Sequence, residues 1–332
     1  MAWDRIRAAK AQHETTLFAR ANVVGVAIGH KVIGGRETDE ACIVVYVESK
    51  RPEFELRRRD IVPKALDGVR TDVVETGRFR AIAMMEPRGL QRTTRIRPAP
   101  GGVSVGHERV SAGTLGVLAQ RADGSPVLLS NNHIFANSND ARAGDPILQP
   151  GPADGGTAVD AIARLDEFVP IVFSDRELGP LGRLVERGFA PLLALFGLGL
   201  KRLPSDRTNL VDAAVASPLG SDLASPEILE IGRVVGTTEA EIGMRVQKSG
   251  RTTGRTSGRV RALDGVVQVD YDARTAVFRQ QIISDLLSRG GDSGSLVVDE
   301  RRRAVGLLFA GSDRATILNP IHAVLNRLQL RL

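Results

Sequence analysis

The stretch SRGGDSGSLVV, residues 288–298, joins a glycine-rich turn to the start of a β-branched strand. Glycine permits backbone conformations that a side chain would obstruct. The stretch therefore has two interpretations. It is either a turn that only connects two strands, or a rigid turn that presents the hydroxyl of Ser293. The second interpretation requires a base for that serine elsewhere in the chain.

Short apolar runs separated by turn residues recur after residue 102. They include TLGVLAQ, VLLS, VDAAVAS, GRVVG, VVQVDYD and AVGLLFAG. Many short strands at close spacing predict an all-β barrel or sandwich. The chain then ends in one helix, for which Asn319 is the expected N-cap and Pro320 the first helical residue. The apolar face of this helix is formed by Ile321, Val324, Leu325 and Leu328.

Residues 1–85 show a different pattern, which predicts a separate N-terminal domain. Two β-branched runs, residues 22–32 and 41–48, flank a turn-rich hairpin loop. The polar, partly helical segment RPEFELRRRDIVPKAL separates them from a third strand, GVRTDVVE. The sequence therefore predicts a compact β-β-α-β unit.

Two further segments lack the strand pattern. Residues 86–102 are rich in proline, glycine and arginine, which predicts an exposed linker. Residues 165–205 are apolar and leucine-rich, and we expect a partly helical insertion that packs on the barrel or forms an oligomer contact. A substrate lid and a membrane-surface element are the alternatives. Residues 103–332 are then the main domain.

The composition is that of a globular protein. The 332 residues are 42% hydrophobic and 25% charged, and no apolar run is long enough to span a bilayer. The first residues lack the features of a secretory signal, and the lone Cys42 cannot form an internal disulfide, so we expect a cytoplasmic protein. The net charge of +6 comes from scattered arginines, and aromatic residues are only 4%, which disfavours nucleic-acid binding.

Five histidines are candidates for the base that Ser293 requires. His133 follows the apolar strand in PVLLSNNHIFAN, and the end of a strand is rigid and partly open, as a base needs. The other four lie in less suitable places, namely His13, His30, His107 and His322. We therefore predict that His133 is the base.

A carboxylate has to fix the tautomer of such a histidine. Asp212 lies in the apolar stretch NLVDAAVAS, where a carboxylate is costly unless it has a hydrogen-bonding role. Asp160 lies in similar sequence, TAVDAIARL, but follows His133 so closely that little chain is left for the intervening strands. We therefore prefer Asp212 and keep Asp160 as the alternative.

The order His133, Asp212, Ser293 is that of chymotrypsin-like double barrels. Residues 103–332 resemble the trypsin-like serine peptidases, especially the disulfide-free bacterial forms and the related plant narrow-leaf-type proteins. The resemblance rests on LLSNNHIF, NLVDAAVA, GRTTGRTSGRV, GGDSGSLVV, AVGLLFAG and NPIHAVL. It implies a mainly β fold, a chymotrypsin-like double β-barrel with a C-terminal helix. This chain adds the helical insertion and a small N-terminal α+β domain.

The resemblance implies a serine endopeptidase that cleaves protein or peptide substrates through an acyl-enzyme intermediate. Its catalytic residues would be His133, Asp212 and Ser293, and the N–H groups of Gly291 and Ser293 would form the oxyanion hole. No metal or organic cofactor is implied. Leu287 takes the position at the base of the primary specificity pocket, which implies an apolar pocket. Leu286 takes that place after a one-residue shift.

Two departures from the family leave alternatives open. Ser295 stands where secreted digestive enzymes usually have glycine, and nothing before the first barrel resembles an activation sequence. One alternative is a trypsin-fold scaffold or a self-processing protein with little turnover, and the other is a nucleic-acid-associated protein. A homo-oligomer formed through residues 165–205 or the N-terminal domain is a further expectation.

The stretch QKSGRTTGRTSGRV, residues 247–260, is glycine-rich and basic like a phosphate-binding loop. However, three residues rather than four separate Gly250 from Gly254, and Arg255 replaces the lysine of such a loop. We therefore interpret the stretch as a hairpin of the second barrel.

Overall fold

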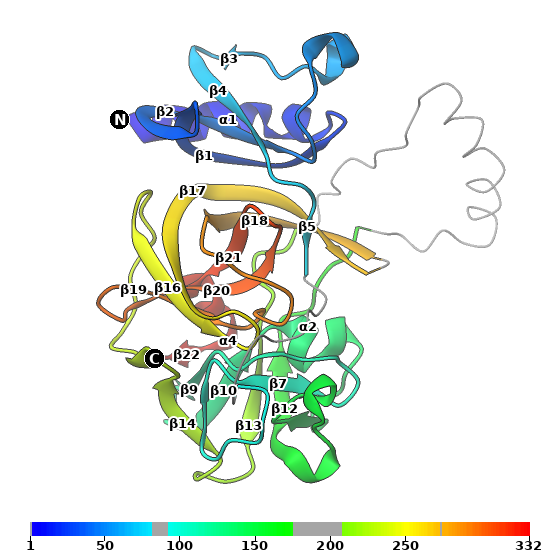
Figure 1. Cartoon of the computed structure of the whole chain (residues 1–332), viewed down its shortest axis with the longest axis vertical. Coiled ribbons are helices and arrows are strands. Elements are labelled where there is room, and N and C mark those ends of the chain that lie inside the picture. Colours follow the sequence, from blue (N-terminus) through cyan, green and yellow to red (C-terminus); the bar gives the residue numbers. More distant parts are fainter. Residues whose placement is uncertain (1, 82–91, 175–207, 273) are drawn as a thin grey trace, which may run out of the picture.

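The structure is a computed structural model that describes residues 2–81, 92–174, 208–272 and 274–332. The described chain is built around two large β-sheets, one of eight and one of 11 strands, with a small three-stranded sheet beside them. Figure 1 shows them stacked, with the eight-stranded sheet at the bottom and the N-terminal unit at the top. The expected mainly β architecture is confirmed.

The eight-stranded sheet forms the first barrel. Its buried side chains gather around Leu128, Phe135 and Ile162. In order across the sheet, its strands are β22 (Leu330–Arg331), β9 (Val117–Arg121), β10 (Pro126–Ser130), β13 (Ala214–Pro218), β12 (Ala161–Phe168), β11 (Pro146–Leu148), β7 (Ser104–His107) and β8 (Gly113–Thr114). The three-stranded sheet consists of β15 (Gly232–Arg233), β14 (Ala224–Ile228) and β6 (Ala99–Gly101).

The 11-stranded sheet forms the second barrel and continues into the N-terminal unit. The strands of the barrel are β16 (Arg245–Gly250), β19 (Leu296–Asp299), β20 (Ala304–Gly311), β21 (Thr316–Pro320), β18 (Arg274–Ser284) and β17 (Gly254–Tyr271). The expected C-terminal helix is α4 (Ile321–Leu328), and the four residues of its predicted apolar face are buried.

The N-terminal unit begins with a helix that the sequence analysis did not predict. Helix α1 (Ala2–Phe18) packs on β1 and β2, and Ile6 and Leu17 are buried there. The strands of this unit are β1 (Val23–Ile33), β2 (Arg36–Val47), β3 (Ala65–Leu66), β4 (Val69–Glu75) and β5 (Phe79–Arg80).

The predicted helix between the second and third strands of this unit is wrong. The segment instead contains two 3-10 turns, η1 (Glu53–Glu55) and η2 (Arg58–Asp60). Pro52 and Pro63 flank these turns, and proline fixes φ and removes an N–H donor, which limits a longer helix. The order of elements is therefore α1-β1-β2-β3-β4-β5, with the helix before the first strand, rather than β-β-α-β.

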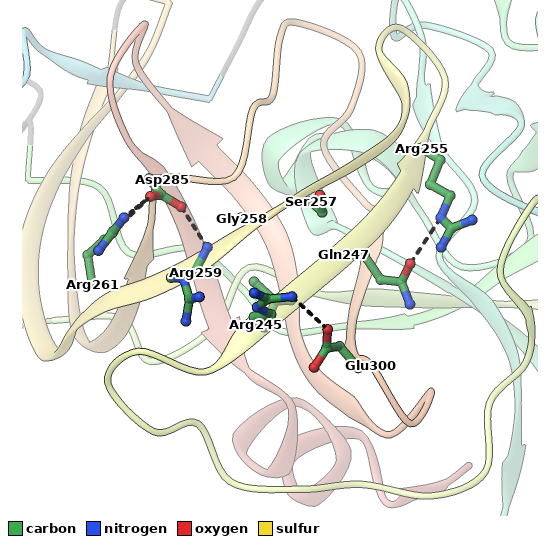
Figure 2. A pocket seen from close by; sticks show the side chains of 10 residues that line it. Arg245, Gln247, Arg255, Ser257, Gly258, Arg259, Arg261, Asp285 and Glu300 are labelled. Carbon is green, nitrogen blue, oxygen red and sulfur yellow. Dashed lines mark hydrogen bonds and ion pairs between the residues drawn. The ribbon is translucent and has the colours of Figure 1, made fainter.

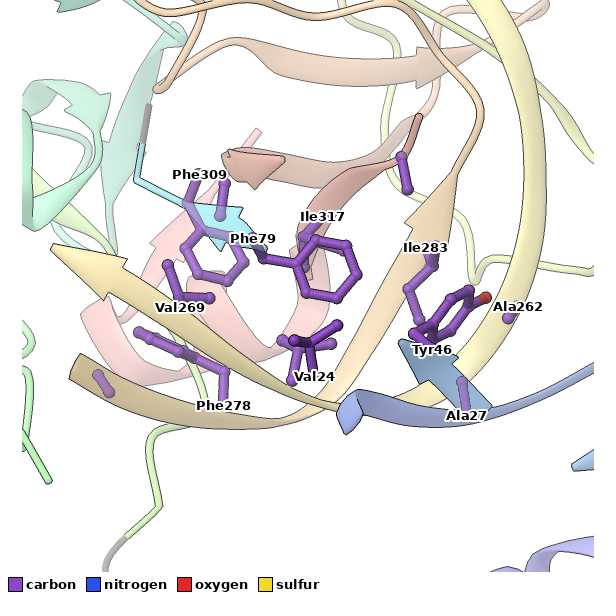
Figure 3. Close-up of a cluster of buried hydrophobic side chains, with 14 of the residues drawn as sticks. Val24, Ala27, Tyr46, Phe79, Ala262, Val269, Phe278, Ile283, Phe309 and Ile317 are labelled. Atoms are coloured by element: carbon purple, nitrogen blue, oxygen red, sulfur yellow. The ribbon is translucent and has the colours of Figure 1, made fainter. Parts of the chain in front are cut away.

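The N-terminal unit and the second barrel share one sheet and one hydrophobic core. Strand β1 pairs antiparallel with β17, with Gly25 opposite Val267 and Gly29 opposite Ala262. Glycine is required at 29, because a Cβ there would lie 2.8 Å from the carbonyl oxygen of Arg261. Figure 3 shows the shared core, in which side chains of β1, β2 and β5 pack against those of the second barrel.

The expectation of an exposed linker is wrong for residues 92–102. Arg92 is buried and donates to Ser249 Oγ at 2.6 Å, and β6 pairs with β14. These contacts connect the segment to the second barrel and to the three-stranded sheet. Residues 86–91 lie outside the described residues.

Most of the predicted insertion at 165–205 also lies outside the described residues. Its first residues complete β12, and Phe173 forms a bridge with Ala276. Short helical elements elsewhere are α2 (Asn132–Phe135), η3 (Asn137–Asn139), η4 (Pro152–Asp154) and η5 (Ala158–Asp160). No helix in the described ranges is long and apolar enough to cross a membrane.

Candidate active site

His133 lies in helix α2, directly after β10. The Nδ2 atom of Asn131 donates to the backbone oxygen of Asp212 at 2.8 Å, and that of Asn132 donates to the oxygen of Val169 at 2.7 Å. Both asparagine side chains are buried. These bonds fix the turn of helix that carries His133, so the polar pair that ends the predicted strand has a structural role.

His133 and Asp212 are in direct contact. Nδ1 of His133 lies 2.6 Å from Oδ2 of Asp212, and the backbone N–H of His133 donates to Oδ1 at 3.3 Å. The Asp212 carboxylate is fully buried. A carboxylate accepts from Nδ1–H, so this contact selects the tautomer with a free Nε2. Within the described ranges, Nε2 has no hydrogen-bond partner.

Two residues that the sequence analysis missed complete the surroundings of Asp212. Tyr271 Oη donates to Oδ2 at 2.8 Å, and the backbone N–H of Asp212 donates to Oδ1 of Asn319 at 2.9 Å. Asn319 is not the helix cap that was expected, because Pro320 takes the N-cap position. The polar Asn319 within the apolar sequence TILNP is the one signal that pointed to a buried role.

Asp160 lies in a different setting from Asp212. It forms a capping box with Thr157, and its side chain pairs with Arg95 at 3.4 Å. Hydrogen bonds from the backbone and side chain of Thr157 lower the pKa of Asp160. These contacts give Asp160 a local structural role, as a capping residue of η5.

The loop that carries Ser293 is held between the two barrels. The N–H of Thr114 donates to the oxygen of Ser293 at 2.8 Å, and the N–H of Gly294 donates to the oxygen of Leu308 at 2.8 Å. Gly294 has a φ of 96°, and a Cβ there would collide with Thr114 and Ser130. Ser130 lies three positions before His133, so the loop packs against the strand end that precedes the histidine.

The Ser293 hydroxyl is buried and points to the backbone of β20. Oγ donates to the oxygen of Phe309 at 3.3 Å, and the residue is 1% exposed. In this structure the hydroxyl is therefore hydrogen-bonded to a carbonyl rather than to His133. Catalytic hydrogen bonds often form only when a substrate is bound.

The N–H groups of Gly291 and Ser293 have no acceptor within the described ranges. The neighbouring carbonyls are fixed, since Thr252 Oγ1 donates to the oxygen of Gly290 at 2.6 Å and Thr114 Oγ1 to that of Gly291 at 2.8 Å. Gly291 has a φ of 93°, and a Cβ would clash with Thr252. The turn thus leaves two amides for a ligand.

Asp292 connects this turn to the β16–β17 hairpin. Its carboxylate accepts from the N–H groups of Thr252 and Thr253 at 2.9 and 3.0 Å, and it lies 3.3 Å from Nζ of Lys248. Both charged side chains are fully buried. Burial lowers the pKa of Lys248, and the charge of Asp292 opposes this shift. A lysine of the chain itself therefore supplies the counter-charge to Asp292.

The stretch 247–260 forms the hairpin that the sequence analysis preferred. Gly250 pairs with Gly254 at its tip, and the buried Arg251 forms an ion pair with Asp154. A cavity of about 610 Å³ lies along β16 and β17 (Figure 2). Each of its four arginines has a partner in the protein, as for Arg245 with Glu300 and Arg261 with Asp285. Two of the positive charges thus face carboxylates, whereas Arg255 and Arg259 donate to the neutral acceptors Gln247 Oε1 and Gly243 O.

The structure leaves Leu287 exposed. Its side chain is 51% exposed, whereas that of Leu286 is buried. A cavity of about 970 Å³ lies next to the turn, but neither leucine lines it. It lies between barrel residues and the N-terminal unit, and its lining includes Arg289, Gly290, Gly311, Arg80 and Glu48. In the described part of the chain, no cluster of His, Cys, Asp and Glu is arranged as a metal site.

No protein-family model matches the sequence, and no curated protein matches it. Among solved structures, the chain is similar to chymotrypsin of Cellulomonas bogoriensis, with 18% identity, 70% of this chain and 97% of that chain covered, and a TM-score of 0.42. It is also similar to protease A of Thermobifida fusca, with 16% identity, 70% and 97% coverage and a TM-score of 0.44.

A third similar structure is the Nocardiopsis protease, with 19% identity, 70% and 98% coverage and a TM-score of 0.43. All three are named as proteases, and the first of them as a chymotrypsin. Because the identities and TM-scores are low, the chemistry assigned to the site rests on the geometry described above.

Proposed function

We propose that this chain is a serine endopeptidase. His133 takes the proton of Ser293 as Oγ attacks the carbonyl carbon of a peptide bond, and Asp212 stabilises the resulting imidazolium. The N–H groups of Gly291 and Ser293 bind the oxyanion of the tetrahedral intermediate. His133 then protonates the leaving amine, and water activated by the same residue hydrolyses the acyl-enzyme.

The difference between the two ring nitrogens of His133 is the observation that carries this proposal. Nδ1 is engaged by Asp212 at 2.6 Å, while Nε2 has no partner in the described chain. A general base needs one ring nitrogen fixed and the other free. The nearby turn offers a hydroxyl and two amides without acceptors, which is the set of groups that acyl transfer requires.

The experiment compares the full-length wild-type protein with Ser293→Ala on a denatured proteome. New N-termini are identified by mass spectrometry. The proposal predicts new termini with the wild type and none above background with Ser293→Ala. Cleavage that persists with Ser293→Ala contradicts the assignment of the nucleophile.

The N-terminal unit favours a second candidate, a self-processing protein with little turnover on other proteins. β19 pairs with β20 only as far as Leu307, and the edge beyond it lies beside Ser293. Extended peptides commonly bind by adding a strand to such an edge. Here Arg80 of β5 already pairs antiparallel with Gly311 of β20. Part of the edge that a substrate would use is thus occupied by the chain itself.

Deleting residues 1–85 would not show whether β5 restrains the site, because the deletion exposes core residues such as Val267 and Phe278. We propose Arg80→Pro in the full chain, since proline cannot donate to a strand pairing. Arg78→Pro is the matched control, because Arg78 lies outside β5 and is exposed. If β5 restrains the site, Arg80→Pro alone raises hydrolysis of a small peptide ester. An unchanged rate would show that β5 does not restrain the site.

A further inference from the structure

The Asp212 carboxylate accepts a hydrogen bond from a residue outside the proposed triad. Tyr271 Oη donates to Oδ2 at 2.8 Å, the same oxygen that contacts His133 Nδ1 at 2.6 Å. We propose that Tyr271 is a positioning residue, whose hydroxyl holds the carboxylate in the orientation that directs Nε2 of His133 to Ser293. This inference rests on the proposed function, but one of its tests does not require turnover.

The surroundings of Asp212 explain why a hydroxyl donor is needed. The side chain is fully buried, and a buried carboxylate is costly unless hydrogen bonds stabilise its charge. Oδ1 accepts a long bond of 3.3 Å from the N–H of His133. The two short bonds, from His133 and Tyr271, both end on Oδ2. The hydroxyl therefore opposes rotation of the carboxylate, which would turn Oδ2 away from Nδ1.

Packing fixes the tyrosine ring in turn. Tyr271 is 5% exposed, and its ring lies edge-on to those of Phe173 and His133 at centroid distances of 5.6 and 5.8 Å. The ring of Phe278 lies 6.2 Å away on another side. Because rings surround Tyr271 on these sides, its hydroxyl cannot leave Asp212 without disturbing the core. The same ring also limits the movement of the imidazole.

The Tyr271 hydroxyl remains a hydrogen-bond donor over the whole pH range in which a histidine acts as a base. Burial raises the pKa of Tyr271 well above its usual value, and the negative charge of Asp212 raises it further. Tyr271 is therefore neutral near pH 7 and keeps its proton for the hydrogen bond.

The position of Tyr271 in the sheet links it to the N-terminal unit. Tyr271 is the last residue of β17. The two residues directly before it, Val269 and Asp270, pair with Phe79 and Arg80 of β5. The N–H of Ala81 also donates to the oxygen of Asp270 at 3.0 Å. The N-terminal unit thus supports the end of the strand that carries the hydroxyl.

The test is Tyr271→Phe, which removes the hydroxyl and keeps the ring. Tyr46→Phe is the matched control, because Tyr46 is the other of only two tyrosines and is buried in the same core. We expect Tyr271→Phe to lower kcat about 10- to 100-fold without a change in KM, as for loss of a hydrogen bond to a charged group. Tyr46→Phe should retain the wild-type kcat.

The second readout is the NMR signal of the Nδ1–H proton of His133, recorded on protein with labelled histidine. Without the donor from Tyr271, more negative charge remains on Asp212 to accept the bond from His133, so we expect Tyr271→Phe to move this signal downfield. In an Asp212→Asn background the same change should have little effect, because the shared partner is gone. This readout does not depend on activity, so a chain that cleaves no peptide would refute the proposed function but still test Tyr271.

The inference is overturned if Tyr271→Phe leaves both kcat and the Nδ1–H signal of His133 at wild-type values. It is equally overturned if Tyr46→Phe produces the same change in both, since the effect would then come from loss of a buried hydroxyl in general.

Discussion

Two partly buried histidine–aspartate pairs lie in the described part of the first barrel, and they differ in what the second ring nitrogen does. In the His107–Asp145 pair, Nε2 contacts the carboxylate at 3.0 Å and Nδ1 accepts from the N–H of Arg109 at 3.1 Å. In the His133–Asp212 pair, Nδ1 contacts the carboxylate and Nε2 has no partner in the described chain. A histidine with both nitrogens occupied is a structural link, whereas one with a free nitrogen can exchange protons.

The largest expected difference between the pairs is in catalysis. Ser293→Ala and His133→Ala should each abolish peptide hydrolysis without unfolding the protein. The double variant should be scarcely worse than either single variant, because members of a triad act as a unit. Measured kcat/KM values that show independent, multiplying losses would contradict the triad.

The two aspartates provide the next test. Asp212→Asn should lower kcat about 10⁴-fold, because an amide favours the wrong histidine tautomer. Asp145→Asn changes the same chemical group in the structural pair, and Asp160→Asn removes the rejected alternative, so both should cost far less. If Asp160→Asn or Asp145→Asn causes the larger loss of kcat, the assignment of Asp212 is wrong.

His107→Gln should affect stability rather than activity. His107 is fully buried, and its loss leaves Asp145 and the N–H of Arg109 without one of their partners. A buried polar group that loses its partner costs about 1–3 kcal/mol in the free energy of unfolding. Urea unfolding should show this loss while kcat stays near the wild-type value. A large fall in kcat with unchanged stability would contradict the structural role of the His107–Asp145 pair.

The smallest expected effect is the pH dependence of stability that Asp145 contributes. The N–H of Arg142 and the contact with His107 lower the pKa of Asp145, although partial burial opposes them. A lowered folded-state pKa means that the contribution is present above the unfolded value of about 3.9 and is lost as the pH falls through the folded value. Acid unfolding of Asp145→Asn should therefore be less steep. A profile identical to that of the wild type would show that the pair contributes nothing.

The sequence was sufficient for features that are local in the chain. The glycines around Ser293 and the short apolar runs indicated the turn and the mainly β fold. His133 and Asp212 were chosen from their own flanking residues, and their side chains are in contact. The catalytic roles themselves stay predictions.

The features that were missed depend on contacts between distant segments. Tyr271 lies near the tip of the long β17–β18 hairpin and reaches Asp212, 59 positions earlier in the chain, which no local pattern encodes. Helix α1 was missed because charges interrupt its buried face, where Lys10 pairs with Glu14 at 2.6 Å and with Asp264 at 3.3 Å. A charged residue on the buried face of a helix is unfavourable without a partner, and the sequence alone does not show that Lys10 has two.

The central claim, that a free Nε2 on His133 activates Ser293, is tested most directly by covalent labelling. The full-length wild type, His133→Ala and His107→Gln are treated with a fluorophosphonate, and the modified residue is identified by mass spectrometry. The account predicts that Ser293 is labelled in the wild type and at a similar rate in His107→Gln, but not in His133→Ala. Equal labelling in all three proteins, or labelling that is lost in His107→Gln and kept in His133→Ala, would contradict it.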